Sequence, residues 1–346
     1  MSVMILDASN SIIKAKIARR ERSEIAFPHV IKQLTAAEYN NNLARAGASG
    51  PPLDYIRING QPYAVGACAE RHGVQVQRTG AARYTRDYNG VFAAAALARL
   101  YEHSMDISIL GSHPPGDMKF RDDLMKAVVG GWHIEQGNHE RHFKVIYANT
   151  FDEPVGGLMK VLLTEDGQHY QRTDINSGRS LVTDIGGFTT DWIAVNPGGE
   201  VDYSLARSVP IGIQNVVADF EASFRANNLQ VAKDTPVLPP ERVRRAIATG
   251  VFDGAGRHYP CEKEVQEATN MLLNRILDTY QHIAGGSLSW DAIILTGGGS
   301  GLLYKRLQPI LNHERVILAD DLESIHLANV RGGLKLWRLY EALQVL

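Results

Sequence analysis

Two aspartates stand at the ends of apolar stretches in two distant parts of the chain. Asp7 follows residues 3–6 and Asp184 follows residues 180–183, and in each case a short polar or glycine turn leads into a second apolar stretch. Glycines let a backbone approach a bulky anion, and unpaired N–H groups in such a turn can hold it. A carboxylate beside an anion requires a cation between them, and Mg²⁺ binds both carboxylates and phosphates. This pattern predicts a site for a phosphate with Mg²⁺.

The two aspartates are separated by about half of the 346 residues. Repetition of a supersecondary unit at this distance indicates two related domains, and the length is compatible with two domains or one large one. The turns of the two domains could then face each other across a cleft. The expected division is domain I at 1–180, with a small, mostly β insertion at about 25–80, and domain II at 181–327, with a small insertion at about 228–262.

The elements that must position these residues follow from the apolar pattern, which predicts an α/β protein. Hairpins are expected at 3–18 and 180–195, and a third is expected around Asn59-Gly60. A buried strand at 107–110 is followed by a loop at 111–116. Helices are expected at about 87–103, up to 129, up to 163, 210–227, 239–248, 264–283, from 302, and from 324 to the end.

Two further glycine turns follow buried strands. Gly297, Gly298 and Gly299 lie between a strand at 290–295 and a helix, where backbone amides and a helix N-terminus can take a nucleotide. Their spacing does not match a dinucleotide fingerprint. Residues 111–116 have the glycine spacing of a Walker A loop. Asp117 and Met118 stand where that loop needs Lys and Ser or Thr, which excludes a P-loop NTPase.

Glu153 lies between a strand and a proline that can open a helix. Asp152 and Glu153 could simply compensate the helix dipole. This element connects the first domain to the second, however, and a carboxylate at such a hinge could reach into the cleft and orient a water molecule. Three nearby histidines, His133, His139 and His142, lack a zinc-protease spacing, and we expect them to be solvated rather than to bind metal.

Composition excludes several classes of function. With a net charge of −2, the chain has no basic field for nucleic acid or an anionic membrane. The two cysteines, Cys68 and Cys261, provide neither a disulfide framework nor a metal-binding spacing. No apolar stretch approaches the length of a membrane span, and the chain begins with a strand rather than a signal peptide. We therefore expect a cytoplasmic protein.

Five motifs together resemble the actin-like ATPase superfamily in kind and in order. They look like its phosphate-1, connect-1, phosphate-2, adenosine and connect-2 motifs, and the resemblance spans nearly the whole chain. Within the superfamily the chain is most similar to the ParM/StbA plasmid-segregation actins. The five motifs lie at 7–14, 152–154, 184–189, 294–299 and 328–332.

The resemblance implies two ribonuclease-H-like domains with ATP or GTP and Mg²⁺ between them, and a final helix at about 328–346 that returns to domain I. Asp7 and Asp184 would hold the metal, and Glu153 would orient the attacking water, so Glu153 and Asp184 are the expected catalytic residues. Gly212 would lie near the ribose or the phosphates. The expected phosphate contacts are Ser9, Asn10, Ser11, Lys14, Gly186, Gly187 and Thr189, and the adenosine contacts are Gly297, Gly298 and Gly299.

One position departs from the family, because Ser9 stands where glycine is usual. If the turn needs a positive φ, a serine there is strained, and the rate of hydrolysis is affected more than the fold.

The leading interpretation is a polymerising ATPase that forms filaments and serves plasmid or DNA segregation through a DNA-binding adaptor protein. Direct contact with nucleic acid or a membrane is not expected. Fold alone does not decide function. The alternatives are a sugar or small-molecule kinase, a chaperone-type ATPase, for which no substrate-binding domain follows residue 346, and a scaffold that binds ATP without turnover.

Overall fold

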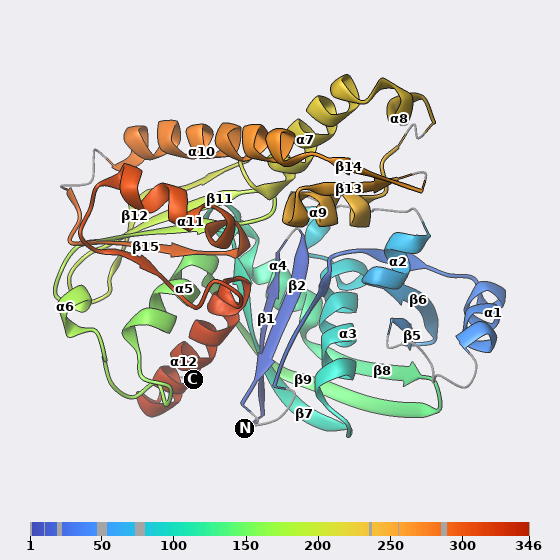
Figure 1. Cartoon of the computed structure of the whole chain (residues 1–346). Helices are drawn as coiled ribbons and strands as arrows, with labels where there is room; N and C mark the ends of the chain where they lie inside the picture. The colour runs from blue at the N-terminus through green and yellow to red at the C-terminus, as the bar shows by residue number, and fades with distance from the viewer. Residues whose placement is uncertain are drawn as a thin grey trace.

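The computed structural model describes residues 2–9, 11–18, 23–46, 54–72, 80–234, 237–254, 256–284 and 289–345. Two β-sheets with helices packed against them form the molecule (Figure 1). The first sheet comprises β1 (Val3–Ala8), β2 (Ile12–Ile17), β3 (Glu24–Pro28), β4 (Ile31–Gln33), β5 (Tyr55–Ile58), β6 (Gln61–Val65), β7 (Met105–His113), β8 (Gly130–Gln136) and β9 (His139–Asp152). The second comprises β10 (Ser180–Ile185), β11 (Thr190–Val195), β12 (Val201–Val209), β15 (Ala292–Thr296) and β16 (Val316–Leu318).

The two sheets repeat one topology, which confirms the predicted α/β class. Five strands of the first sheet are ordered β3-β2-β1-β7-β9, and the second sheet is ordered β12-β11-β10-β15-β16. In both, the first three strands are antiparallel and the last two add in parallel. The predicted hairpins at 3–18 and 180–195 are the central units of the two sheets, so Asp7 and Asp184 occupy equivalent positions.

The described part of the segment at about 25–80 is mostly β and is continuous with the first sheet. Strands β5, β6 and β4 extend the first sheet beyond β8, while α1 (Ala36–Ala46) and α2 (Ala67–Arg71) flank them. Asn59 and Gly60 join β5 to β6 with φ values of 49° and 80°. These left-handed conformations are those that a two-residue hairpin turn needs.

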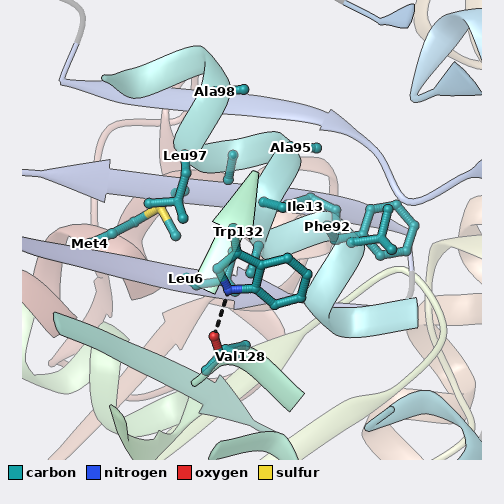
Figure 2. Packing of buried hydrophobic residues seen from close by; sticks show 14 of the residues in the cluster. Met4, Leu6, Ile13, Phe92, Ala95, Leu97, Ala98, Val128 and Trp132 are labelled. Atoms are coloured by element: carbon teal, nitrogen blue, oxygen red, sulfur yellow. Dashed lines mark hydrogen bonds between the residues drawn. The ribbon is translucent and has the colours of Figure 1, made fainter. Parts of the chain in front are cut away.

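The first core lies between this sheet and α3 (Val91–Leu100). Residues 93–96 are four alanines without solvent exposure, and side chains this small let the helix pack closely on the strands. Figure 2 shows Leu97 of α3 beside Met4 of β1. Trp132 of β8 donates its Nε1–H to the backbone oxygen of Val128 at 2.8 Å, which joins the sheet to α4 (Arg121–Val128).

The loop expected at 111–116 is partly strand. Residues 111–113 continue β7 because they stay paired with β9 as far as Asp152. Because these strands stay paired, His113 of β7 and Asp152 of β9 lie side by side at the ends of two parallel strands.

Short helical turns connect some of the longer elements. They are η2 (Gly80–Arg83), the π-helical η3 (Arg86–Gly90), η4 (Pro115–Phe120) and, near the C-terminus, η6 (Ile325–Leu327).

The second core lies between the second sheet and two long helices, α7 (Ile213–Asn227) and α10 (Glu262–Ala284). Phe220 and Phe224 of α7 pack against the core, and Phe224 meets Phe252 at 4.8 Å between ring centres. The remaining elements around this sheet are α6 (Thr173–Asn176), α8 (Leu229–Asp234), α9 (Pro240–Thr249), β13 (Val251–Gly254), β14 (Arg257–Pro260) and α11 (Gly298–Leu311).

Two helices cross between the sheets. Helix α5 (Glu153–Leu162) leads from the first sheet to the second, and α12 (Ala328–Ala342) packs on α5, β1 and β2. A Cβ added at Gly332 would lie 1.7 Å from the backbone oxygen of Gly156, so only glycine permits this crossing. None of the helices in the described ranges has the length and apolar character needed to cross a membrane.

A bidentate ion pair joins the two halves far from these crossing helices. Arg244 of α9 donates to both carboxylate oxygens of Glu70 of α2, at 3.2 and 2.9 Å. Figure 1 shows α2 and α9 next to each other, on the side of the molecule away from α5 and α12. The two halves are therefore joined both at α5 and α12 and at the pair formed by α2 and α9.

Candidate active site

The metal-binding aspartates proposed from the sequence lie at matched positions in the two central hairpins. Asp7 in β1 is paired across the hairpin with Lys14, and Asp184 in β10 is paired with Asp191. All four side chains are buried. The two aspartates are close enough to interact electrostatically, because the charge of Asp7 contributes to the raised pKa of Asp184. The structure thus brings the two hairpins into one electrostatic site.

Lys14 holds the first aspartate. Its Nζ donates to Asp7 Oδ2 at 2.7 Å. Burial opposes the positive charge, but Asp7, Asp184 and Glu153 outweigh it and raise the pKa of Lys14. Lys14 therefore stays protonated, and an ammonium has three N–H donors. It can hold Asp7 and still offer a donor to an incoming phosphate oxygen.

Asp184 is held by the first turn of the last helix, α12, and by the end of β15. Asn329 donates its Nδ2–H to Asp184 Oδ2 at 2.6 Å, and Thr296 donates its hydroxyl to Asn329 Oδ1 at 2.9 Å. Burial raises the pKa of Asp184 to about 6, against the effects of Lys14 and Asn329. Gly297 has a φ of 81°, and a Cβ there would lie 2.1 Å from Asp184 Oδ1. Only glycine fits beside this carboxylate.

Asp191 is a buried carboxylate that we did not predict. Thr189 donates its hydroxyl to Asp191 Oδ2 at 2.9 Å, so this threonine, expected to contact phosphate, faces a carboxylate. Burial raises the pKa of Asp191 to about 7, and Asp184 adds to the effect. A comparison of the two hairpins could have found it, because Asp191 stands where the first hairpin has Lys14.

Glu153 begins α5 and points into the same carboxylate cluster. It is 5% exposed, and its Oε1 has no hydrogen-bond partner among the described residues. Burial, followed by the charges of Asp7, Asp191 and Asp184, raises its pKa well above the usual range. A surface helix cap would be solvated and free of such repulsion. The position favours a role in the site over compensation of the helix dipole.

The donor set fits the expected metal. Four buried carboxylates converge, and orphaned oxygens remain on Glu153 and Asp191 among the described residues. Burial is the main cause of the raised pKa values of Asp184, Asp191 and Glu153, so a further cation would stabilise their charged forms. Carboxylate oxygens are the ligands that Mg²⁺ prefers, together with water and phosphate. A hydrated Mg²⁺ would supply positive charge between these carboxylates and a polyphosphate.

The two turns touch where the halves meet. A Cβ added at Gly187 would lie 2.3 Å from Ser11 Oγ, so the second turn rests directly on the first. The amide of Gly186 donates to the backbone oxygen of Thr189 at 2.8 Å and is used within its own turn. Gly212 packs against the second turn as well, since a Cβ there would lie 2.7 Å from Gly187 O. Gly212 therefore packs directly on the backbone of the second turn, at Gly186 and Gly187.

The first turn accommodates Ser9 without the strain considered above. Ser9 is not among the described residues with a positive φ. Its amide donates to Asp7 Oδ1 at 3.0 Å and its hydroxyl donates to Ile12 O at 2.8 Å. These bonds close the turn. Asn10, expected to contact phosphate, lies outside the described residues.

The glycine turn after β15 lies against the second hairpin. A Cβ at Gly299 would meet Ile185 Cγ2 at 2.4 Å, whereas one at Gly298 would find its nearest described neighbour, His326, at 3.6 Å. Gly297 precedes the first turn of α11. Gly298 thus has the most room of the three for a bound group, and the adenosine contact remains a prediction.

Comparison with known proteins agrees with this arrangement. Residues 182–309 match the family model of the archaeal actin homologue MreB-like C-terminal domain. Ta0583, an archaeal actin homologue, superposes with a TM-score of 0.75 at 18% identity over 100% of both chains. The chain has the actin-like fold. A ParM filament structure from Clostridium botulinum gives 0.73 at 18% identity, covering 97% of this chain and 98% of that chain.

The structure of Ta0583 in complex with ADP superposes with a TM-score of 0.74 at 18% identity over 100% of both chains. No curated protein matches the sequence. The resemblance inferred from the five motifs is therefore confirmed for the actin-like fold, and the two related sheets are its two halves. The individual ligand contacts of this actin-like chain remain predictions.

Arg83 is a second residue that the sequence did not reveal. It is 2% exposed, donates to the backbone oxygen of Ala8 and lies 3.7 Å from a carboxylate oxygen of Asp117. Its charge acts on both Glu153 and Asp191, opposing the rise in their pKa values. Arg83 belongs to none of the five actin-like motifs. Like Lys14, it brings positive charge to the carboxylate cluster.

His29 packs against the first turn, and its buried side chain makes the stability of the actin-like chain depend on pH. Its amide donates to Ser11 O at 3.0 Å, and its ring lies 4.3 Å from that of Phe92. Burial, and then the charge of Arg83, lower the pKa of His29 from its ordinary value of 6.5 to about 3. Between these values the unfolded chain binds a proton that the folded chain does not. Stability is therefore lost as the pH falls from about 6.5 towards 3.

The variant His29→Phe is expected to flatten this part of the profile of melting temperature against pH, because phenylalanine does not titrate and keeps the ring contacts. His139→Phe, at an exposed position, serves as the control and should leave the slope unchanged. Equal slopes in the parent and the His29 variant would show that this histidine does not limit acid stability.

Proposed function

We propose that this chain is a polymerising ATPase of the actin-like type, which binds ATP or GTP with Mg²⁺ between its two halves. The observation that supports this most directly is the convergence of Asp7, Asp184 and Glu153, from separate parts of the chain, on one buried site with excess negative charge. Such a site is costly unless cationic and anionic groups bind there together. The ADP complex of Ta0583 adds support for a nucleotide.

The residues divide the work of phosphoryl transfer. Asp7 and Asp184 would hold Mg²⁺, largely through its waters, and Mg²⁺ when bound would offset the phosphate charge. The positively charged side chains of Lys14 and Arg83 would stabilise the negative charge of the phosphates. Glu153 would accept a hydrogen bond from the attacking water and hold it in line with the γ-phosphate. Positioning and electrostatics provide most of the catalysis in such reactions.

We further propose that nucleotide binding favours filaments and that hydrolysis loosens them. The partner is a second copy of the chain, and a DNA-binding adaptor protein would connect the filament to plasmid DNA. The superposition with a ParM filament structure supports self-association. A net charge of −2 argues against direct contact with DNA or an anionic membrane. We also propose that the protein works in the cytoplasm.

Light scattering followed by phosphate release tests the proposal. Mixing the chain with ATP and Mg²⁺ should raise the scattering, and phosphate should then appear without any added acceptor. ADP with Mg²⁺, and ATP with a chelator, are the controls and should give neither signal. Phosphate transfer only in the presence of a sugar or another acceptor, without scattering, would indicate a kinase. Scattering without phosphate release would indicate an ATP-gated scaffold.

A further inference from the structure

The β8–β9 hairpin carries a cluster of two histidines and a glutamate, on the first sheet and outside the active site. His133 of β8 and His142 of β9 are direct partners across the hairpin. Their rings are stacked, 4.6 Å apart between centres and 5° from parallel. Glu140 lies two residues before His142 and so faces the same side of the sheet. The cluster therefore presents three potential ligands on one face.

The ligand atoms converge on one point. His133 Nε2 lies 2.8 Å from Glu140 Oε1, and His142 Nε2 lies 3.3 Å from the same oxygen. One ligand atom from each of the three residues lies within 4.8 Å of the others. In a tetrahedral zinc site with bonds of about 2.0–2.1 Å, ligand atoms are roughly 3.3 Å apart. The two rings are stacked almost parallel, so one imidazole must rotate about its side-chain bonds before both Nε2 lone pairs can point at one ion.

The backbone of both histidines is fixed from outside the hairpin. The amide of His133 donates to Asn59 Oδ1 at 2.9 Å, and the amide of His142 donates to Ser104 Oγ at 2.8 Å. A cavity of about 630 Å³, lined by these four residues among others, adjoins the pair. The scaffold thus holds two ligands in place and leaves room for an open coordination position.

We propose that His133, Glu140 and His142 bind one divalent transition-metal ion of the zinc class, with water in the fourth position. Imidazole nitrogens suit zinc, copper and nickel, whereas Mg²⁺ prefers oxygen ligands. The site is therefore chemically distinct from the one proposed for Mg²⁺ at Asp7 and Asp184. His142 and Glu140 are exposed, in line with the expected solvation, and the proposal rests on the paired strands, which place the Nε2 atoms of His133 and His142 next to one carboxylate.

Zinc titration by calorimetry tests the site. The whole chain is first freed of metal with a chelator and dialysed, and Zn²⁺ is then added in the presence of excess Mg²⁺. We expect one equivalent to bind. His133→Ala and His142→Ala should each weaken binding by about 10-fold or more, on the scale of disturbed metal coordination. Glu140→Gln keeps the size of the side chain and should also weaken it.

His139→Ala is the matched control, because His139 is exposed on the same hairpin and outside the cluster. It should bind Zn²⁺ like the parent. A second readout is the melting temperature, which Zn²⁺ should raise in the parent and in His139→Ala but not in the double variant of His133 and His142. Absence of binding in the parent, or undiminished binding in the double variant, would overturn the proposal.

Discussion

Replacing Glu153 with glutamine is expected to slow ATP hydrolysis by about 100-fold, the scale of a lost general base. Glutamine keeps the shape of the side chain but is a poorer acceptor for the proton of an attacking water. ATP should bind as well or better, because a negative charge leaves a site in which the pKa of Glu153 is raised by burial and by Asp7, Asp191 and Asp184. Filaments formed in ATP should persist longer. Phosphate release and sedimentation measure the two effects.

The melting temperature of the same variant separates catalysis from helix capping. Loss of a repelled, buried charge should leave Glu153→Gln as stable as the parent or more stable. A carboxylate that only compensated the helix dipole would give lower stability and near-normal turnover. Glu153→Asp is the companion variant, because it keeps the charge at the start of α5 but withdraws the carboxylate. Normal hydrolysis in either variant would remove Glu153 from the mechanism.

Removing both metal-binding charges, with Asp7→Asn and Asp184→Asn together, should nearly abolish Mg²⁺-dependent nucleotide binding. If each carboxylate holds the metal through water, removing one carboxylate should lower the affinity for the metal about 10–100-fold, as for other outer-shell partners of a metal ion. Asparagine keeps the volume, so the Lys14 and Asn329 contacts can be retained in altered form. Calorimetry with ATP and Mg²⁺ measures the loss.

The same double variant has an internal control. With a chelator in place of Mg²⁺, the two aspartates can only repel the phosphates, so the variant should bind ATP at least as well as the parent. The order of affinities should therefore reverse when Mg²⁺ is removed. An affinity loss of the same size with and without Mg²⁺ would mean that the substitutions damage the fold of the hairpins rather than a metal site.

The sequence could predict the features that repeat or that follow local chemistry. Asp7 and Asp184 were found because each ends an apolar strand before a turn, and the pairing of β1 with β2 and of β10 with β11 has the predicted form. The turn at Asn59 and Gly60 was found because few residues adopt a positive φ. Local rules of this kind act over a few residues and need no knowledge of the tertiary fold.

Arg83 and the contact made by Asn329 were missed because they reach the site through long-range contacts, whereas Asp191, also missed, is paired with Asp184 within one hairpin. Arg83 lies 75 positions from Ala8, to which it donates a hydrogen bond, and Asn329 lies 145 positions from Asp184. No periodicity or turn signal connects such pairs. Asn329 was part of a recognised motif, yet its contact with Asp184 depends on how the last helix crosses α5. The closeness of His133 and His142 likewise follows from strand register and not from spacing along the chain, while the predicted solvent exposure agrees with the structure at His142.

The two halves of the molecule are connected at the crossing of α5 and α12 and, at a distance from it, by one ion pair. Gly156 and Gly332 bring two backbones into contact, and the side chains around them, such as Leu158 and Leu334, belong to one buried core, so the halves are held firmly at this crossing. The pair Arg244–Glu70 lies on the opposite side of the molecule (Figure 1). A rotation of one half relative to the other about the crossing of α5 and α12 would therefore displace the ion pair further than groups near the crossing. The exposed arginine can part from its carboxylate at a cost of only about 1 kcal/mol, so the edge at α2 and α9 is held far more weakly than the crossing of α5 and α12.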